Sequence, residues 1–143
     1  MNVKKFYESK RQLKKFALEM LNHLNTGTKT GLLTLEDNIR TDTHYVVKVL
    51  LILLMNGTDP KYSKQIIEDL IIHSDLTDNE AAMVRMFSFY IRLGEYPEKV
   101  RHSVNLVFGL DITFEDLHEA LLSKDVVLSQ KEIDELMEAV SKE

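Results

Sequence analysis

The 143-residue chain contains no cysteine or tryptophan, and only two prolines and five glycines. Without cysteine it can form no disulfide and no thiolate metal site, and it has no thiol nucleophile. Small secreted domains often depend on disulfides, so the composition favours a reducing cytoplasm. Because all-β folds need many turns, the scarcity of glycine and proline favours helices over sheets.

The sequence also lacks an apolar run of membrane-spanning length. Its longest run, residues 46–55, is interrupted by Lys48 and is roughly half of what a transmembrane helix needs, about 20 residues. The N-terminal segment MNVKKFYESKRQ holds no apolar core of signal-peptide length. These features predict a cytoplasmic, soluble protein that uses the apolar run as a buried helix.

Acidic residues outnumber basic ones, giving a net charge of −5, but the first fifteen residues are basic. The basic residues there are Lys4, Lys5, Lys10, Arg11, Lys14 and Lys15. This segment can attract the acidic C-terminal residues, within one chain or between two. It can also contact anionic lipid, with Phe6 and Phe16 inserted beside the lysines, or simply be solvated. No nucleic-acid partner is expected, because the remainder is acidic and no recognised motif is present.

Apolar residues recur at helical spacing along most of the chain. A first helix is predicted over residues 2–24, ended by the glycine- and threonine-rich segment 25–31. A strongly apolar helix is predicted over residues 43–55, capped by Thr41 or Asp42. This helix is apolar nearly all round, so we expect it at the centre of the fold.

Capping and turn residues delimit the other helices. Asn56-Gly57 is expected to end the apolar helix, and Asp59-Pro60 to begin the next one. Gly94 and Gly109 should each end a helix, and Pro97 should begin one. Capping boxes are predicted at Thr77–Glu80, Thr113–Asp116 and Ser129–Glu132. Tyr45, Val107 and Phe114 are among the apolar residues expected on buried faces.

These signals predict an all-α fold, a compact bundle of about seven or eight helices without a sheet. We expect one helical domain, residues 1–143, composed of a first half over 1–75 and additional amphipathic helices over 76–143.

Catalytic and cofactor motifs are missing from the sequence. It has no phosphate-binding glycine loop, no nucleophile elbow and no paired-histidine metal spacing. The C-terminal segment LSQKEIDELMEAVSKE resembles the helix before a calcium loop, but the loop itself is missing. A non-enzymatic protein without a cofactor or a metal is therefore predicted.

Two short motifs with helix-breaking residues flank the apolar helix. The motif before it is Gly31-Leu32-Leu33-Thr34-Leu35-Glu36, and the motif after it is Asn56-Gly57-Thr58-Asp59-Pro60. In order and separation they are similar to the GLLALE and DGTDP blocks in the cytoplasmic loop of MotA-type flagellar stator subunits. Residues of about 13–72 therefore resemble this loop of the MotA/TolQ/ExbB proton-channel family. The membrane helices of that family have no counterpart here, so no ion-channel activity is expected.

In that family, charged residues of the loop contact the rotor. The resemblance places the family's acidic residue at Glu36, and the family's basic residue corresponds to Thr28. Further candidate contacts near Glu36 are Lys29, Leu32 and Arg40. The residues with a structural role in the two blocks are Gly31, Leu35, Gly57, Asp59 and Pro60.

The leading hypothesis is a motility-associated interaction protein in the cytoplasm or at the inner face of the membrane. It would present a helical surface to a flagellar rotor or stator component, or to another copy of itself. One alternative is a general helical adaptor unrelated to the flagellum. Another is a helical domain with a small ligand or an enzymatic site between its two halves, which a deep pocket with converging polar groups would support.

Overall fold

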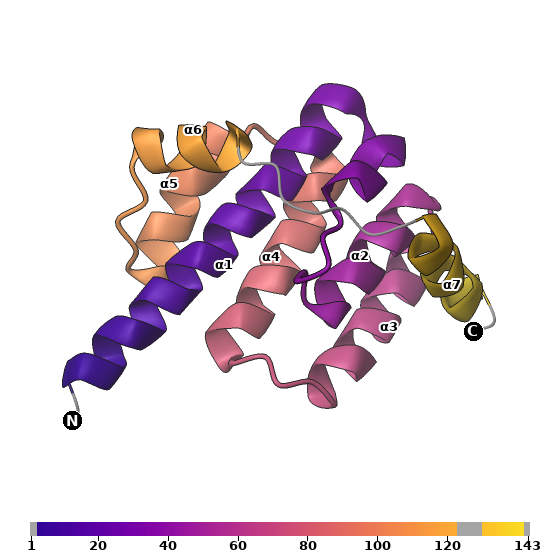
Figure 1. Ribbon diagram of the computed structural model, residues 1–143, viewed down its shortest axis with the longest axis horizontal. Coiled ribbons are helices and arrows are strands. Elements are labelled where there is room, and N and C mark those ends of the chain that lie inside the picture. Colours follow the sequence, from indigo (N-terminus) through magenta and orange to yellow (C-terminus); the bar gives the residue numbers. More distant parts are fainter. Residues whose placement is uncertain (1–2, 123–129, 142–143) are drawn as a thin grey trace.

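The computed structural model describes residues 3–122 and 130–141, and these residues form helices without any strand (Figure 1). The elements are α1 (Val3–Thr30), the 3-10 helix η1 (Leu32–Asn38), α2 (Tyr45–Met55), α3 (Pro60–Ile72), α4 (Asp78–Leu93), α5 (Pro97–Phe108), α6 (Phe114–Leu122) and α7 (Gln130–Ser141). The predicted all-α fold of seven or eight helices is therefore confirmed for the described residues.

Helix α2 forms the centre of the core, as its composition predicts. Eight of its eleven residues are buried, Val46, Val47 and Val49 to Leu54 among them. It contacts η1, α3, α4 and α7. Because each fully buried side chain of this size contributes about 1.5–3 kcal/mol relative to an exposed one, α2 is a major source of the stability of the bundle.

Helix α1 crosses the molecule diagonally and contacts η1, α4, α5 and α6 (Figure 1). Elements of both halves of the chain are therefore in contact, since α1 belongs to residues 1–75 and α4 to α6 belong to residues 76–143. In the same way, α7 packs against α2.

The predicted end of the first helix is wrong, because α1 continues through the glycine- and threonine-rich segment to Thr30. Gly27 lies so close to α4 that an added Cβ would be 3.3 Å from Ile91 Cγ2. In the next position, Thr28 Oγ1 donates a hydrogen bond to the Glu95 carbonyl oxygen, 2.9 Å away. These tertiary contacts offset the low helix propensity of glycine and threonine.

Most predicted helix caps are confirmed. Asp59 caps α3, with its Oδ1 accepting from Lys61 N at 3.0 Å. Thr77 and Glu80 form a complete capping box at the start of α4. Thr113 and Asp116 exchange two backbone-to-side-chain hydrogen bonds of 3.0 Å each at the start of α6. The box predicted at Ser129–Glu132 begins outside the described residues.

The predicted cap of α2 is wrong. Neither Thr41 nor Asp42 caps it; His44 does, and its Nδ1 accepts a hydrogen bond from Val46 N at 3.1 Å. The opposite ring nitrogen, Nε2, therefore carries the proton and donates to Asp75 Oδ1 at 2.6 Å. This hydrogen bond lowers the pKa of Asp75.

Three apolar side chains expected on buried faces are exposed instead. Tyr45 is 52% exposed in the first turn of α2, Phe114 is 62% exposed at the start of α6, and Val107 is 66% exposed in the last turn of α5. Helices α5 and α6 are held mainly by α1, so each of them buries only a narrow stripe. In α5 that stripe consists of Val100 and Val104.

Candidate protein-interaction site

The block that begins at Gly31 forms the corner between α1 and η1. Gly31 has a φ of 95°, a conformation that residues with a Cβ rarely adopt, and the helical path of α1 ends there. Leu35 is completely buried in the core, and η1 contacts both α1 and α2. The corner is therefore fixed to the centre of the bundle by an apolar anchor.

Hydrogen bonds from threonines add to the rigidity of this corner. Thr30 Oγ1 donates to the Thr26 carbonyl oxygen at 2.8 Å, and Thr34 Oγ1 donates to the Gly31 carbonyl oxygen at 2.9 Å. The hydroxyls of Thr30 and Thr34 also contact each other. The last turn of α1 and the first turn of η1 are thus joined by side chains as well as by the backbone.

The corner presents an apolar side chain between charges. Leu33 is 77% exposed, Lys29 is exposed in the last turn of α1, and Glu36 is partly exposed. Residues three apart share a side of a 3-10 helix, so Leu33 and Glu36 lie on the outer side of η1. We call Lys29, Leu33 and Glu36 the corner surface.

Leu33 is absent from the predicted contacts, which include Leu32 instead. Leu32 shares the inner side of η1 with Leu35 and packs against the core. The exposed leucine is the next residue along. A period of three within the GLLTLE block would have been the signal for it.

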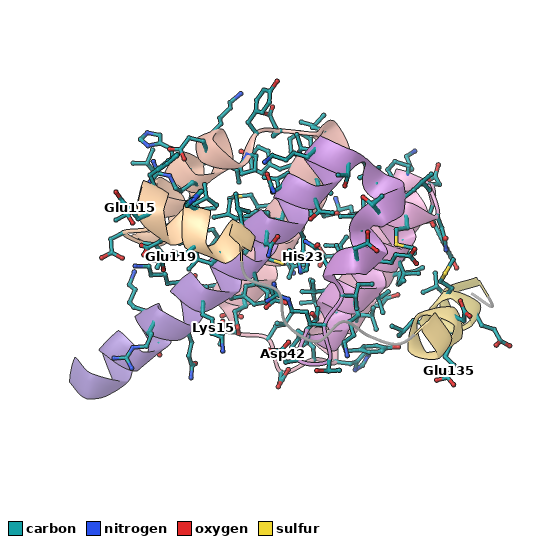
Figure 2. The ribbon with its side chains drawn as sticks, turned by 45° about the horizontal axis from the view of Figure 1, so that its top comes forward. Lys15, His23, Asp42, Glu115, Glu119 and Glu135 are labelled. Carbon is teal, nitrogen blue, oxygen red and sulfur yellow. The ribbon has the colours of Figure 1, made fainter. Side chains whose placement is uncertain are left out.

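Arg40 lies apart from the corner surface, after the end of η1. It lines a shallow pocket of about 220 Å³ with Lys15, Glu19 and Asp42, to which Asn22, Leu18 and Ala120 also contribute. Lys15 and Asp42 are labelled in this region in Figure 2. Two cations and two carboxylates line the pocket, so its formal charges cancel and favour no ligand of one sign.

Two of the six N-terminal basic residues pair with groups near the end of α5 and in α6. Lys10 Nζ donates to the carbonyl oxygens of Phe108, at 2.9 Å, and Gly109, at 3.1 Å. Lys14 Nζ lies 3.0 Å from Asp116 Oδ2 and 3.3 Å from Asp111 Oδ1. The hydrogen bond to Asp116 raises the pKa of Lys14. The expected attraction between basic and acidic segments therefore occurs within the chain.

The other basic residues are placed differently. Arg11 and Lys15 are exposed on α1, whereas Lys4 and Lys5 belong to α1 but their side chains lie outside the described residues. Phe16, expected as an insert into lipid, is only 7% exposed and belongs to the core. That part of the lipid-contact prediction is wrong, because Phe16 lies on the side of α1 that faces the bundle.

One polar pair without hydrogen bonds lies on α1 and includes a buried histidine. His23 is 1% exposed, and neither of its ring nitrogens has a hydrogen-bond partner. Its Nε2 lies 3.6 Å from Glu19 Oε1, one turn earlier on the helix. His23 is labelled near the middle of the view in Figure 2. In the described part of the chain, no three residues of the metal-binding types come together as a metal site.

Comparison of the chain with models of known families, with curated proteins and with solved structures found no match. None of the helices within residues 3–122 and 130–141 combines the length and the hydrophobicity needed to cross a bilayer.

Proposed function

We propose that this chain is a non-enzymatic interaction protein that docks onto a flagellar rotor or stator component through its corner surface. The observation that carries the proposal is the exposed leucine, Leu33, on a corner that also carries the exposed Lys29 and the partly exposed Glu36. The resemblance of the GLLTLE block to the stator loop supplies the class of partner. No ion conduction is part of this proposal.

The chemistry of the corner surface suits docking. A large apolar side chain that becomes covered in a complex provides affinity, whereas neighbouring charges mainly determine partner choice and association rate. A surface that is rigid before binding loses little conformational entropy when it docks. Here the buried side chain of Leu35 and the threonine hydrogen bonds supply that rigidity.

Affinity capture from motile cells tests this proposal. The tagged chain should retain flagellar rotor or stator proteins, and Leu33→Asp and Glu36→Lys should each reduce their recovery and the swimming speed. Glu119→Lys is the matched control, because Glu119 is an exposed acid on α6, away from the corner (Figure 2). Circular dichroism should show the same helical content in all three variants.

Two outcomes would contradict the proposal. One is capture without any flagellar protein; the other is normal swimming in cells that carry Leu33→Asp or Glu36→Lys. Capture of one defined non-flagellar protein, lost in the same two variants, would favour the general adaptor instead.

A further inference from the structure

A groove separates α3 from α4 on a face that the corner surface does not include. The groove has a volume of about 390 Å³. Its lining consists of Pro60, Lys64, Ile67 and Glu68 from α3 and of Arg85, Ser88, Phe89 and Arg92 from α4. The two helices follow each other in the chain and are joined by a loop at the lower edge of Figure 1. We call this feature the α3–α4 groove.

The α3–α4 groove has an apolar centre. Ile67 is 3% exposed and forms part of the floor, whereas the neighbouring Phe89 is 60% exposed. The Phe89 ring meets the ring of Tyr90 edge-on, with 5.7 Å between the centroids. An exposed phenylalanine beside a buried isoleucine gives an apolar side chain of a partner a surface to cover.

The rim of the groove is positively charged. The lining contains one acid, Glu68, and three cations, Lys64, Arg85 and Arg92. It therefore carries a net charge of +2, in a chain whose net charge is −5. Glu68 is already satisfied, because Arg85 Nε and Nη2 donate to its two oxygens at 2.7 and 3.0 Å. The local charge therefore opposes that of the whole protein and favours an acidic partner.

Two of the three cations in the lining remain available to a partner. Arg85 is engaged by Glu68, which leaves Lys64 on α3 and Arg92 on α4. Arg92 lies at the end of the groove near the start of α3, where its Nη1 donates to the Thr58 carbonyl oxygen at 3.4 Å. Because these two cations belong to different helices, a partner with several carboxylates can pair with both.

We propose that the α3–α4 groove binds an acidic amphipathic helix of a partner protein. The apolar stripe of that helix packs on Ile67 and Phe89, and its flanking carboxylates pair with Lys64 and Arg92. This is the general mode in which an amphipathic helix is recognised by an apolar groove. The site is separate from the corner surface, so it goes beyond the proposed docking function.

Fluorescence anisotropy with two synthetic peptides tests the proposal. Both probes are fluorescently labelled helical peptides of about 18 residues, with leucines spaced alternately three and four residues apart. The leucines are flanked by glutamates in one peptide and by lysines in the other. The intact chain should bind the glutamate peptide at least about tenfold more tightly than the lysine peptide, and salt should weaken this preference.

Variants of the chain locate the binding. Arg92→Glu and Phe89→Ala should each weaken binding of the glutamate peptide by about tenfold. Lys64→Glu repeats the charge test at an exposed position on the other helix. The matched control is Arg11→Glu, an exposed cation on α1, which should leave the affinity unchanged. Leu33→Asp should bind the glutamate peptide with unchanged affinity. A failure of the groove proposal can therefore be distinguished from a failure of the proposed docking through the corner surface.

Three results would overturn the proposal. The first is equal affinity for the two peptides, and the second is an affinity that Arg92→Glu and Lys64→Glu both leave unchanged. The third is a dimer, seen by sedimentation velocity, that Phe89→Ala abolishes, because the occupant of the groove would then be a second copy of this chain.

Discussion

Lys14 Nζ lies 3.0 Å from Asp116 Oδ2, and this ion pair connects α1 to the first turn of α6. The side chains are 29% and 31% exposed. Asp116 also accepts the backbone hydrogen bond of Thr113. That bond, followed by the hydrogen bond from Lys14, lowers the pKa of Asp116. One carboxylate thus caps α6 and holds it on α1.

The stability contributed by Asp116 should depend on pH. Because its pKa is lowered in the folded state, the contribution is complete above the ordinary aspartate range and is lost as the pH falls through the lowered pKa. At neutral pH, Asp116→Asn should reduce the free energy of unfolding by about 0.2–1 kcal/mol. Urea titrations at several pH values should show the difference shrinking below about pH 4.

Asp111→Asn is the control for this effect. Asp111 also approaches Lys14, at 3.3 Å, but it is 92% exposed, so its replacement should change stability less. A larger loss in Asp111→Asn than in Asp116→Asn would contradict the role assigned to Asp116.

Gly27 should tolerate alanine but no larger side chain. Leucine at this position must displace Ile91, so Gly27→Leu should lower the free energy of unfolding by about 1–3 kcal/mol. For Gly27→Ala, a gain in helix propensity of about 1 kcal/mol opposes the tight 3.3 Å contact, so the net change should be small. Thermal unfolding of both variants measures these changes in stability. Lys29→Leu is the control, because Lys29 is an exposed residue in the same helical turn. Equal stability of Gly27→Leu and the parent would exclude close packing there.

Removing the cap of α2 should destabilise the central helix. His44→Ala removes the acceptor of the Val46 amide, and the loss of an N-cap typically costs about 0.5–2 kcal/mol. Thr41→Ala and Asp42→Ala should have much smaller effects, although both residues are more usual caps. Chemical denaturation of the three variants compares them. If Asp42→Ala were the most damaging, the cap would be assigned wrongly.

The ion pair across the α3–α4 groove should contribute little to stability. Arg85 and Glu68 are both partly exposed, and exposed ion pairs typically contribute about 0.2–1 kcal/mol. A double-mutant cycle with Arg85→Gln and Glu68→Gln should therefore give a coupling energy below about 1 kcal/mol. A much larger coupling would mean that the pair, rather than the core, holds α3 against α4.

Features that depend on a few neighbouring residues could be predicted from the sequence. The cap at Asp59 and the box at Thr77–Glu80 each join a side chain to a backbone amide within three residues. Burial of α2 was predictable for a similar reason, because a helix with apolar residues nearly all round must lie inside.

Features that depend on distant residues could not be predicted. Gly27 reads as a helix breaker until Ile91, which lies on another helix, is placed against it. His44 reads as a surface residue, because Thr41 and Asp42 are better caps by type, yet the chain turns into α2 only after them. The exposure of Leu33 depends on which side of η1 packs against α1 and α2.

The candidate sites divide in the same way. The corner surface could be approached from the GLLTLE block and its flanks: the block contains Glu36, and Lys29 lies two residues before it, but the predicted contacts include Leu32 rather than Leu33. The α3–α4 groove could not be predicted, because Lys64 and Arg92 belong to different helices that only the folded structure brings to one groove.

The contact between α2 and α7 affects how the protein is made. Ribosomes release α2 long before α7, whose Val140 is buried in the shared core. Until α7 has emerged, one flank of an almost wholly apolar helix remains uncovered, and such surfaces cause nascent chains to aggregate. Translation that stalls between these two helices should therefore leave a product that requires a chaperone to stay dispersed.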